Sequence, residues 1–289
     1  MEKIAVIDVG SNSVRLMFVA DGKVLYKTLE TTRLGEGIAL SKTLKEGAIE
    51  RTANAVARFY DRAKSEGANV VRVFATAAVR SATNGRDFVV RVQELRPVEV
   101  EVLSGVEEAE IGILGALGTR DGTVIDVGGA STEIIVQENG KILYEKSVDV
   151  GVVRLKDLAE RDRQKLQAIV DEAVEAFGEI PFEQPIYLVG GTATTLGAVH
   201  AGLQVYSAKE VTGVTLTAED LRKLTDRLFF LSVEEIAQIP CVEEKRADVL
   251  AGGALWLQTI AERFSLKYLT VSDSDNLEGY AVKRGLMKK

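Results

Sequence analysis

The 289-residue sequence has very few of the side chains on which many catalytic and structural sites depend. It contains one cysteine, Cys241, and one histidine, His200. A single cysteine excludes an intramolecular disulfide and a zinc site built from thiolates. A single histidine excludes metal centres that need several imidazoles. Any chemistry must therefore rest on carboxylates, hydroxyls, backbone amides and arginines.

Positive charge is also in short supply. The chain has 36 lysines and arginines against 43 aspartates and glutamates, for a net charge of -7. This balance argues against non-specific nucleic-acid binding, which needs a positive surface, but it allows a small polyanion in one local pocket. The length and the hydrophobic share of 46% predict about two domains, each with its own core.

Long apolar segments are missing as well. The first residues lack the apolar stretch of a signal peptide. The longest uncharged run, residues 186–208, is rich in glycine and threonine. That composition is typical of a strand, a loop and a small-residue helix rather than of a bilayer span. We therefore expect a cytoplasmic protein with no membrane partner.

Short β-branched segments alternate with helical patterns, which indicates an α/β protein. Helices are expected at residues 49–63, 105–117 and 163–177 and from residue 277 onward. Three later helices are expected between residues 189 and 268, and two of them should open at the capping boxes Thr217–Asp220 and Ser232–Glu235. The expected strands are residues 4–9, 14–20, 23–29, 70–74, 98–103, 124–127, 133–137, 141–146, 186–189 and 268–271.

An internal repeat is the strongest signal in the sequence. Residues 6–26 align without a gap with residues 124–144, 118 residues later, and 10 of the 21 positions are identical. Chance matching at ordinary residue frequencies would give about one or two. We interpret the repeat as a duplicated βββ unit, with Asn139-Gly140 as the hairpin turn of the second copy. The expected domains are residues 1–119 and 120–289, with the C-terminal helix packing back on the first.

Each copy places an Asp-x-Gly turn between two strands. Such a Gly-rich hairpin directs several backbone N–H groups toward one point and forms an anion-binding nest. Asp8 and Asp126 end the first strands, and carboxylate oxygens are the ligands that Mg²⁺ prefers. Two such loops that face each other across a cleft would hold a phosphate chain from both sides. The expected donors are Gly10, Ser11, Asn12 and Ser13 in the first loop, Gly129, Ser131 and Thr132 in the second, and Gly191 and Thr192 at a helix start.

The segments at residues 7–13 and 125–133 resemble the two phosphate loops of the exopolyphosphatase/guanosine pentaphosphate phosphohydrolase (Ppx/GppA) family, which has the actin-like ATPase superfold. Nearly the whole chain takes part in the resemblance. It implies two actin-like (ribonuclease H-like) α/β domains whose duplicated βββ units face an interdomain cleft. Further segments are similar to family motifs in the same order, namely residues 74–80 with Asn84, 102–109, 150–155, 189–194, 246–248 and 271–273.

The resemblance also assigns roles to individual residues. Glu108 falls on the general base that activates the attacking water, and Asp126 and Glu133 fall on positions that support Mg²⁺ and the reacting phosphate. The groups that it places at the substrate phosphates are Gly128, Arg15 and Arg80. This set suits a phosphoanhydride hydrolase, because catalysis there consists mostly of neutralising charge and aligning the water.

The resemblance implies a Mg²⁺-dependent phosphohydrolase, with Mn²⁺ as the alternative metal, that removes terminal orthophosphate from polyphosphate or guanosine pentaphosphate. It favours a homodimer. Four positions depart from the family pattern. Ala77 and Ala130 stand where many members have Ser and Gly, Glu110 stands where Arg is usual, and Leu277 takes the place of another Arg.

Two other classes of function fit parts of the sequence. An actin-like small-molecule kinase also uses two phosphate loops, but it needs an aspartate base for a hydroxyl acceptor and an adenosine pocket, and neither stands out. A non-catalytic protein that binds polyphosphate or guanosine tetra- and pentaphosphate is the other alternative. The intact set of Glu108, Asp126 and Glu133 argues against it.

Overall fold

The computed structural model describes residues 2–288 and divides into two compact units. Unit 1 comprises Met1–Gly115 and Asn276–Lys289, and unit 2 comprises Ala116–Asp275. The division at residue 115 lies slightly before the position expected from the repeat, and the C-terminal helix belongs to unit 1.

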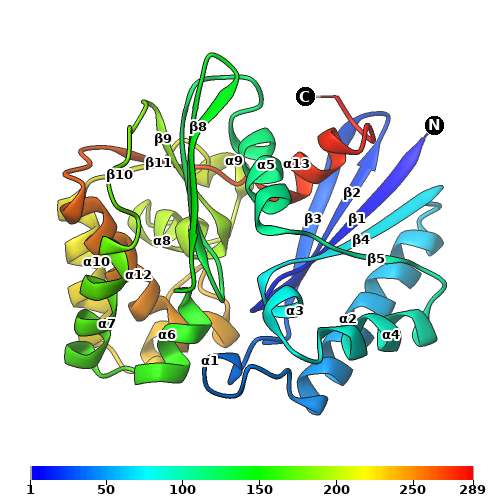
Figure 1. The fold of residues 1–289 in the computed structure, drawn as a ribbon, viewed down its shortest axis with the longest axis horizontal. Helices are drawn as coiled ribbons and strands as arrows, with labels where there is room; N and C mark the ends of the chain where they lie inside the picture. The colour runs from blue at the N-terminus through cyan, green and yellow to red at the C-terminus, as the bar shows by residue number, and fades with distance from the viewer. Residues whose placement is uncertain (1, 289) are drawn as a thin grey trace. The chain divides into compact units, whose positions relative to one another are not determined.

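Unit 1 contains a five-stranded sheet in the order β3-β2-β1-β4-β5 (Figure 1). The first three strands are antiparallel neighbours, whereas β4 runs parallel to β1 and β5 runs parallel to β4. This is the order of a ribonuclease H-like sheet. The strands are β1 (Lys3–Val9), β2 (Ser13–Ala20), β3 (Lys23–Thr31), β4 (Val70–Ala75) and β5 (Val100–Val102).

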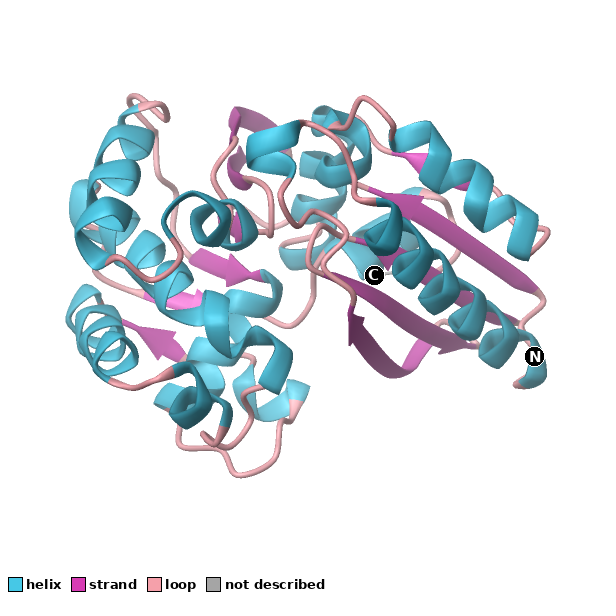
Figure 2. Ribbon diagram, turned by 90° about the horizontal axis from the view of Figure 1, so that it is seen from below, coloured by secondary structure: helices cyan, strands magenta, loops and turns pink. Residues whose placement is uncertain are grey.

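Both faces of this sheet are covered, which explains why β1 reads as a continuous apolar run. Ala5 and Ile7 pack into a core with α2 and α4, which lie side by side on one face (Figure 2). Ile4 and Val6 point the opposite way, into a core with α5 and α13. The helices of unit 1 are α1 (Ile38–Ser41), α2 (Glu46–Ser65), α3 (Ala77–Ser81), α4 (Gly85–Leu95), α5 (Gly105–Ala116) and α13 (Asn276–Lys283).

Unit 2 contains a six-stranded sheet in the order β10-β11-β9-β6-β7-β8. The long helix α12 is central to its core and contacts five other helices, α6, α7, α8, α10 and α11. The strands are β6 (Gly122–Val127), β7 (Thr132–Glu138), β8 (Lys141–Val148), β9 (Ile186–Val189), β10 (Thr215–Leu216) and β11 (Leu269–Val271). The helices are α6 (Val152–Ala159), α7 (Arg163–Glu175), α8 (Gly190–His200), α9 (Ala208–Val211), α10 (Ala218–Phe230), α11 (Val233–Ala237), the 3₁₀ turn η1 (Glu244–Arg246) and α12 (Ala247–Arg263).

The two sheets repeat the same βββ unit in detail. The pairing of β1 with β2 sets Asp8 opposite Arg15, and the pairing of β6 with β7 sets Asp126 opposite Glu133, 118 residues later. Each copy has a register irregularity at the same place, between residues 18 and 19 and between residues 136 and 137. Both hairpin turns, at residues 21–22 and 139–140, have two consecutive positive φ angles, as a type I′ turn requires. The duplication predicted from the sequence therefore extends to strand register.

Other sequence predictions are also confirmed by local structure. Both capping boxes form, with Thr217 and Ser232 as N-caps of α10 and α11. The strand and helix expected within residues 186–208 form as β9 and α8, but α8 begins directly at Gly190 and the loop follows the helix. Within the described residues, no helix has both the length and the apolar character needed to cross a membrane. The sequence patterns did not predict the helices α1, α3, α4, α6 and α9 or the strand β10.

Candidate active site

The first phosphate loop joins β1 to β2 and is held in place by backbone hydrogen bonds. The Gly10 amide donates to the Ser13 carbonyl over 3.0 Å, which closes the hairpin. The Asn12 carbonyl accepts hydrogen bonds of 3.0 and 2.8 Å from the amides of Thr32 and Arg33. The side chains of residues 11–13 are all buried. The predicted donors of this loop therefore lie together on a fixed backbone.

Asp8 and Arg15 form an ion pair next to this loop. They face each other across the β1–β2 pair, and the Arg15 Nε donates to the Asp8 Oδ2 over 2.9 Å. The pair compensates the charge of the buried Asp8 carboxylate within unit 1. Arg15, which the family resemblance places at the substrate phosphates, is thus paired with Asp8, which was predicted to bind the metal.

Glu108 lies in the first turn of α5 and is only 8% exposed. Arg80 on α3 fixes its position, because Nη1 of Arg80 donates to the Glu108 Oε2 over 2.6 Å and to the Leu103 carbonyl over 3.0 Å. Burial raises the pKa of Glu108 above the usual value, against the opposing effects of the Arg80 charge and hydrogen bond. The charge of Asp8 adds to the rise in this pKa. A positioned carboxylate whose pKa is raised toward neutrality suits general-base catalysis.

The neighbouring acid, Glu107, is used for a structural purpose. Its Oε2 accepts from the Ser104 amide over 3.0 Å and from the Ser104 hydroxyl over 2.9 Å, and its own amide donates to that hydroxyl. This reciprocal arrangement is a capping box. The Ser104 backbone hydrogen bond lowers the pKa of Glu107, so two adjacent glutamates have pKa shifts of opposite sign. Such a separation distinguishes the residue better suited to exchange a proton, here Glu108, from the neighbour that ionises more readily.

The second phosphate loop joins β6 to β7 and closes in the same way, with the Gly128 amide donating to the Ser131 carbonyl over 3.0 Å. The carbonyls of Gly128 and Gly129 accept hydrogen bonds of 3.0 and 2.8 Å from the first two amides of α6. A trans peptide sets its carbonyl and its N–H on opposite sides. The amides of Gly129 and Ala130 therefore point away from α6, as an anion-binding nest requires.

Two carboxylates face each other beside this loop. Asp126 and Glu133 are directly opposed in the β6–β7 register, and the Ser147 hydroxyl donates to the Glu133 Oε1 over 2.6 Å. Like charges in this arrangement destabilise a sheet unless a cation intervenes. In unit 1 the position equivalent to Glu133 is Arg15, so the first copy carries its own cation.

The donors beside the second loop fit Mg²⁺. This ion takes oxygen ligands and usually keeps several waters, and one or two carboxylates together with substrate phosphates are enough to hold it. Among residues 2–288, no group of three or more His, Cys, Asp or Glu side chains could enclose a metal. A site formed by Asp126 and Glu133 and completed by water and phosphate is consistent with that arrangement.

The start of α8 lies next to Asp126 and adds a further group. Gly190 has φ +84°, and a Cβ there would come within 2.6 Å of the Asp126 Oδ1. A Cβ on Gly191 would lie 1.9 Å from Nη1 of Arg246, so a guanidinium lies directly against this glycine. Thr192 follows and is buried. Arg246 was not among the predicted phosphate residues, because its closeness to Gly191 is a tertiary contact between segments far apart in sequence.

Thr132 has a different environment from the one expected for a phosphate donor. Its hydroxyl donates to the Val150 carbonyl over 2.6 Å and accepts from the indole N–H of Trp256 over 2.8 Å. The single hydroxyl proton is therefore used inside unit 2.

Each unit thus gathers part of the predicted set. Unit 1 brings the first loop together with the Asp8–Arg15 pair and the Glu108–Arg80 pair. Unit 2 brings the second loop together with Asp126, Glu133 and the start of α8.

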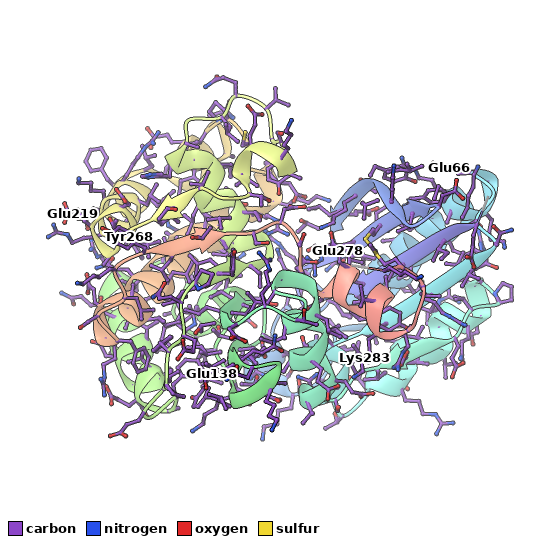
Figure 3. All side chains as sticks on the ribbon, turned by 90° about the horizontal axis from the view of Figure 1, so that it is seen from above. Glu66, Glu138, Glu219, Tyr268, Glu278 and Lys283 are labelled. Atoms are coloured by element: carbon purple, nitrogen blue, oxygen red, sulfur yellow. The ribbon has the colours of Figure 1, made fainter. Side chains whose placement is uncertain are left out.

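The structure shows the environment of the four residues that depart from the family pattern. Glu110, on α5, forms an ion pair with Lys283 on α13, so its charge is compensated locally. Figure 3 labels Lys283 on that helix. Leu277 is buried in the core that α13 shares with the sheet of unit 1. Ala77 and Ala130 are buried as well.

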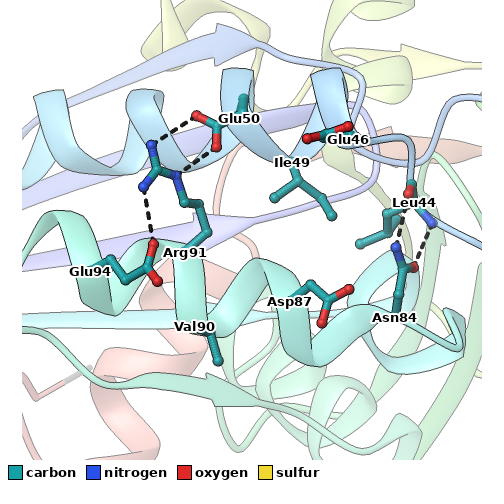
Figure 4. Close-up of a pocket in the computed structure, with 9 residues that line it drawn as sticks. All are labelled: Leu44, Glu46, Ile49, Glu50, Asn84, Asp87, Val90, Arg91 and Glu94. Atoms are coloured by element: carbon teal, nitrogen blue, oxygen red, sulfur yellow. Dashed lines mark hydrogen bonds and ion pairs between the residues drawn. The ribbon is translucent and has the colours of Figure 1, made fainter.

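A groove of about 450 Å³ lies elsewhere in unit 1, between α2 and α4 (Figure 4). Arg91 is its only basic residue and pairs with Glu50 over 2.6 Å and with Glu94 over 3.0 Å. The remaining carboxylates would repel a phosphate chain. The groove is therefore unsuited to such a substrate. Its lining residues are Leu44, Glu46, Ile49, Glu50, Asn84, Asp87, Val90, Arg91 and Glu94.

The chain is similar to known proteins over nearly its whole length. The sequence model of the Ppx/GppA phosphatase family matches residues 6–287. Exopolyphosphatase 2 of Mycobacterium tuberculosis is 30% identical over 98% of each chain. A bifunctional 3-dehydroquinate synthase/phosphatase of Fusobacterium nucleatum is 30% identical over 99% of this chain, which spans 47% of the length of that relative. The crystal structure of the Aquifex aeolicus Ppx/GppA member is 28% identical, with a TM-score of 0.78 over 99% of this chain and 98% of that one. The chain therefore belongs to the Ppx/GppA phosphatase family.

Proposed function

We propose that this protein is a Mg²⁺-dependent phosphohydrolase that removes terminal orthophosphate from a phosphoanhydride chain, with inorganic polyphosphate as substrate and guanosine pentaphosphate as the alternative. The observation that carries the proposal is the environment of Glu108, a buried carboxylate with a raised pKa, held by Arg80 next to a phosphate loop. Family membership and the exopolyphosphatase relative support the choice of substrate.

Glu108 accepts the proton of the attacking water in this proposal. Arg80 holds the carboxylate in one orientation through a 2.6 Å hydrogen bond, and the Leu103 carbonyl holds Arg80 in turn. A base positioned in this way contributes about 10²–10⁴-fold to the rate.

The groups of unit 2 bind and neutralise the phosphate chain. The amides of Gly129 and Ala130 donate to phosphate oxygens, and Arg246 beside Gly191 adds positive charge. Asp126 and Glu133 would hold Mg²⁺, which when bound neutralises negative charge on the phosphates.

Two single substitutions on α5 test the assignment of the base. Glu108→Gln should lower the rate of orthophosphate release from polyphosphate by about 10²–10⁴-fold, because the amide cannot accept the proton. Glu107→Gln is the matched control, since glutamine also serves in a capping box and should leave the rate unchanged. Equal rates for the two variants would refute the role of Glu108.

The same assay separates the candidate substrates. Orthophosphate release is measured with Mg²⁺ on polyphosphates of several lengths, guanosine pentaphosphate and ATP, without an acceptor. Phosphate transfer from ATP only in the presence of a hydroxyl acceptor would indicate a kinase instead. Tight binding of polyphosphate without release would indicate a binding protein.

The proposal includes the assembly and location expected from the sequence, namely a homodimer in the cytoplasm with no membrane partner. Light scattering on the purified protein tests the dimer, since a mass of one chain, 31.3 kDa, would contradict it.

A further inference from the structure

Trp256 is the only tryptophan in the chain and is wholly buried in the core of unit 2. Its indole N–H donates over 2.8 Å to the hydroxyl of Thr132, and this hydroxyl donates over 2.6 Å to the carbonyl of Val150. Thr132 is the first residue of β7, directly after the second phosphate loop, and Val150 lies just before α6, whose amides hold the carbonyls of that loop. Through Thr132, the indole is therefore linked by hydrogen bonds to the strand that follows the second loop and to the segment before α6.

The helix that carries Trp256 also contacts the other anion-binding segments of unit 2. Arg246, the N-cap of α12, lies against Gly191 at the start of α8. A Cβ on Gly253 would lie 2.6 Å from the methyl carbon of Thr192 and 2.8 Å from a methyl carbon of Val152, the first residue of α6. One rigid helix thus supports the loop, the start of α6 and the start of α8.

The hydroxyl of Thr132 is not something that the βββ unit requires. In the first copy the equivalent residue, 118 positions earlier, is Val14, which is buried and has no polar group. Thr132 and Val14 occupy the same place in strands of the same register. A valine therefore satisfies the strand, and the hydroxyl has a purpose specific to the second loop.

We propose that Trp256 is a positioning residue for the phosphohydrolase reaction, which acts through Thr132 to fix the second loop in its phosphate-binding geometry. The inference rests on the proposed function, because it deepens the role of that loop. It has a second consequence. The emission of the single tryptophan reports directly on whether the loop holds phosphate.

Three variants separate positioning from packing. Thr132→Val removes the hydroxyl at nearly constant shape, Thr132→Ser keeps it, and Phe177→Leu is the control. Phe177 stacks on Trp256 at 6.2 Å between ring centroids, so its loss loosens the same aromatic cluster without touching the loop hydrogen bonds. We expect Thr132→Val to raise KM about tenfold with a smaller change in kcat, as expected for the loss of one buried hydrogen bond, and Thr132→Ser to restore KM. Phe177→Leu should lower thermal stability and leave KM unchanged.

The binding readout uses inorganic phosphate with Mg²⁺, followed by tryptophan emission. In the wild-type protein the emission should change saturably, and in Thr132→Val the phosphate concentration for half of the change should rise about tenfold. Equal KM values for Thr132→Val and Phe177→Leu, or emission that ignores phosphate, would overturn the inference. A wild-type protein that releases no orthophosphate from any chain but whose emission titrates with phosphate would refute the proposed function, and with it the role of Trp256 in the reaction, while the support of a phosphate-binding loop by Trp256 and Thr132 would remain.

Discussion

Gly279, on α13, supports the helix that carries the proposed base. A Cβ at this position would lie 1.6 Å from the Ile111 carbonyl oxygen, 2.5 Å from the Ile111 carbonyl carbon and 2.9 Å from the Gly115 amide nitrogen. All three atoms belong to the backbone of α5, so no side chain can rotate to make room. In Gly279→Ala the two helices must separate by at least about 1.4 Å, since a Cβ and a backbone atom do not approach closer than 3.0 Å.

The separation should affect both stability and activity. Overpacking of a core typically costs about 1–3 kcal/mol, which corresponds to a Tm lower by roughly 2–4 °C for each kcal/mol. A misplacement of catalytic groups by about 1 Å costs on the order of 10²-fold in rate, and Glu108 lies one turn before Ile111 on α5. Thermal unfolding and kcat for orthophosphate release measure the two effects.

Gly105→Ala is the matched control, because Gly105 begins the same helix and a Cβ there would meet nothing within 4 Å. We expect this variant to keep the wild-type kcat and Tm. Wild-type values for Gly279→Ala, or equal losses in the two variants, would refute the view that α13 positions the base.

Three further predictions concern the two phosphate-binding units. Because burial raises the pKa of Glu108 above 4.5, activity should fall as the pH decreases through a value above 4.5. Arg80→Met should move this fall to higher pH, since Arg80 lowers the pKa of Glu108. Profiles of kcat/KM against pH check both expectations, and a profile unchanged in the variant would contradict the pairing of Arg80 with Glu108. Gly191→Ala should displace Arg246, because the new Cβ would lie 1.9 Å from Nη1 of its guanidinium, and should raise KM about tenfold with little change in Tm. Gly252→Ala is the control and should change neither KM nor Tm, because the nearest atom to a Cβ there is 3.8 Å away. Glu133→Gln should raise the Mg²⁺ concentration for half-maximal activity by about 10–100-fold, and chelation of the metal should reversibly abolish wild-type activity. A Glu133→Gln variant with the wild-type dependence on Mg²⁺ would show that Glu133 is not a metal ligand.

Much of the fold follows from short-range signals in the sequence. The repeated βββ unit, its Asn139-Gly140 hairpin turn and the capping boxes of α10 and α11 depend on neighbouring residues, and the structure confirms all of them. The helices α3, α4 and α6 have weaker signals. None of the three has a side-chain hydrogen bond at its N-cap, and α6 is fixed by bonds to the second loop instead.

The candidate site likewise contains some features that local sequence predicts and others that only the tertiary fold brings together. A hairpin closed between Gly10 and Ser13 necessarily sets Asp8 opposite Arg15, so this ion pair could have been predicted from the turn alone. The Ser104-x-x-Glu107 pattern is a readable capping box that separates Glu107 from Glu108. By contrast, the approach of Arg246 to Gly191 joins segments that only the packing of α12 brings together, and no local pattern encodes it.

Arg15 in the first copy of the sheet and Glu133 in the second occupy equivalent positions but carry opposite charges. With the same register and the same turn, the first copy has an arginine where the second has a glutamate. The charge at this strand position is therefore opposite in the two copies, since Arg15 pairs with Asp8 whereas Glu133 faces Asp126. Under the proposed function, any dependence of activity on Mg²⁺ would arise in the half of the chain that carries Glu133. The half that carries Arg15 would instead supply Glu108, the proton acceptor proposed for the reaction.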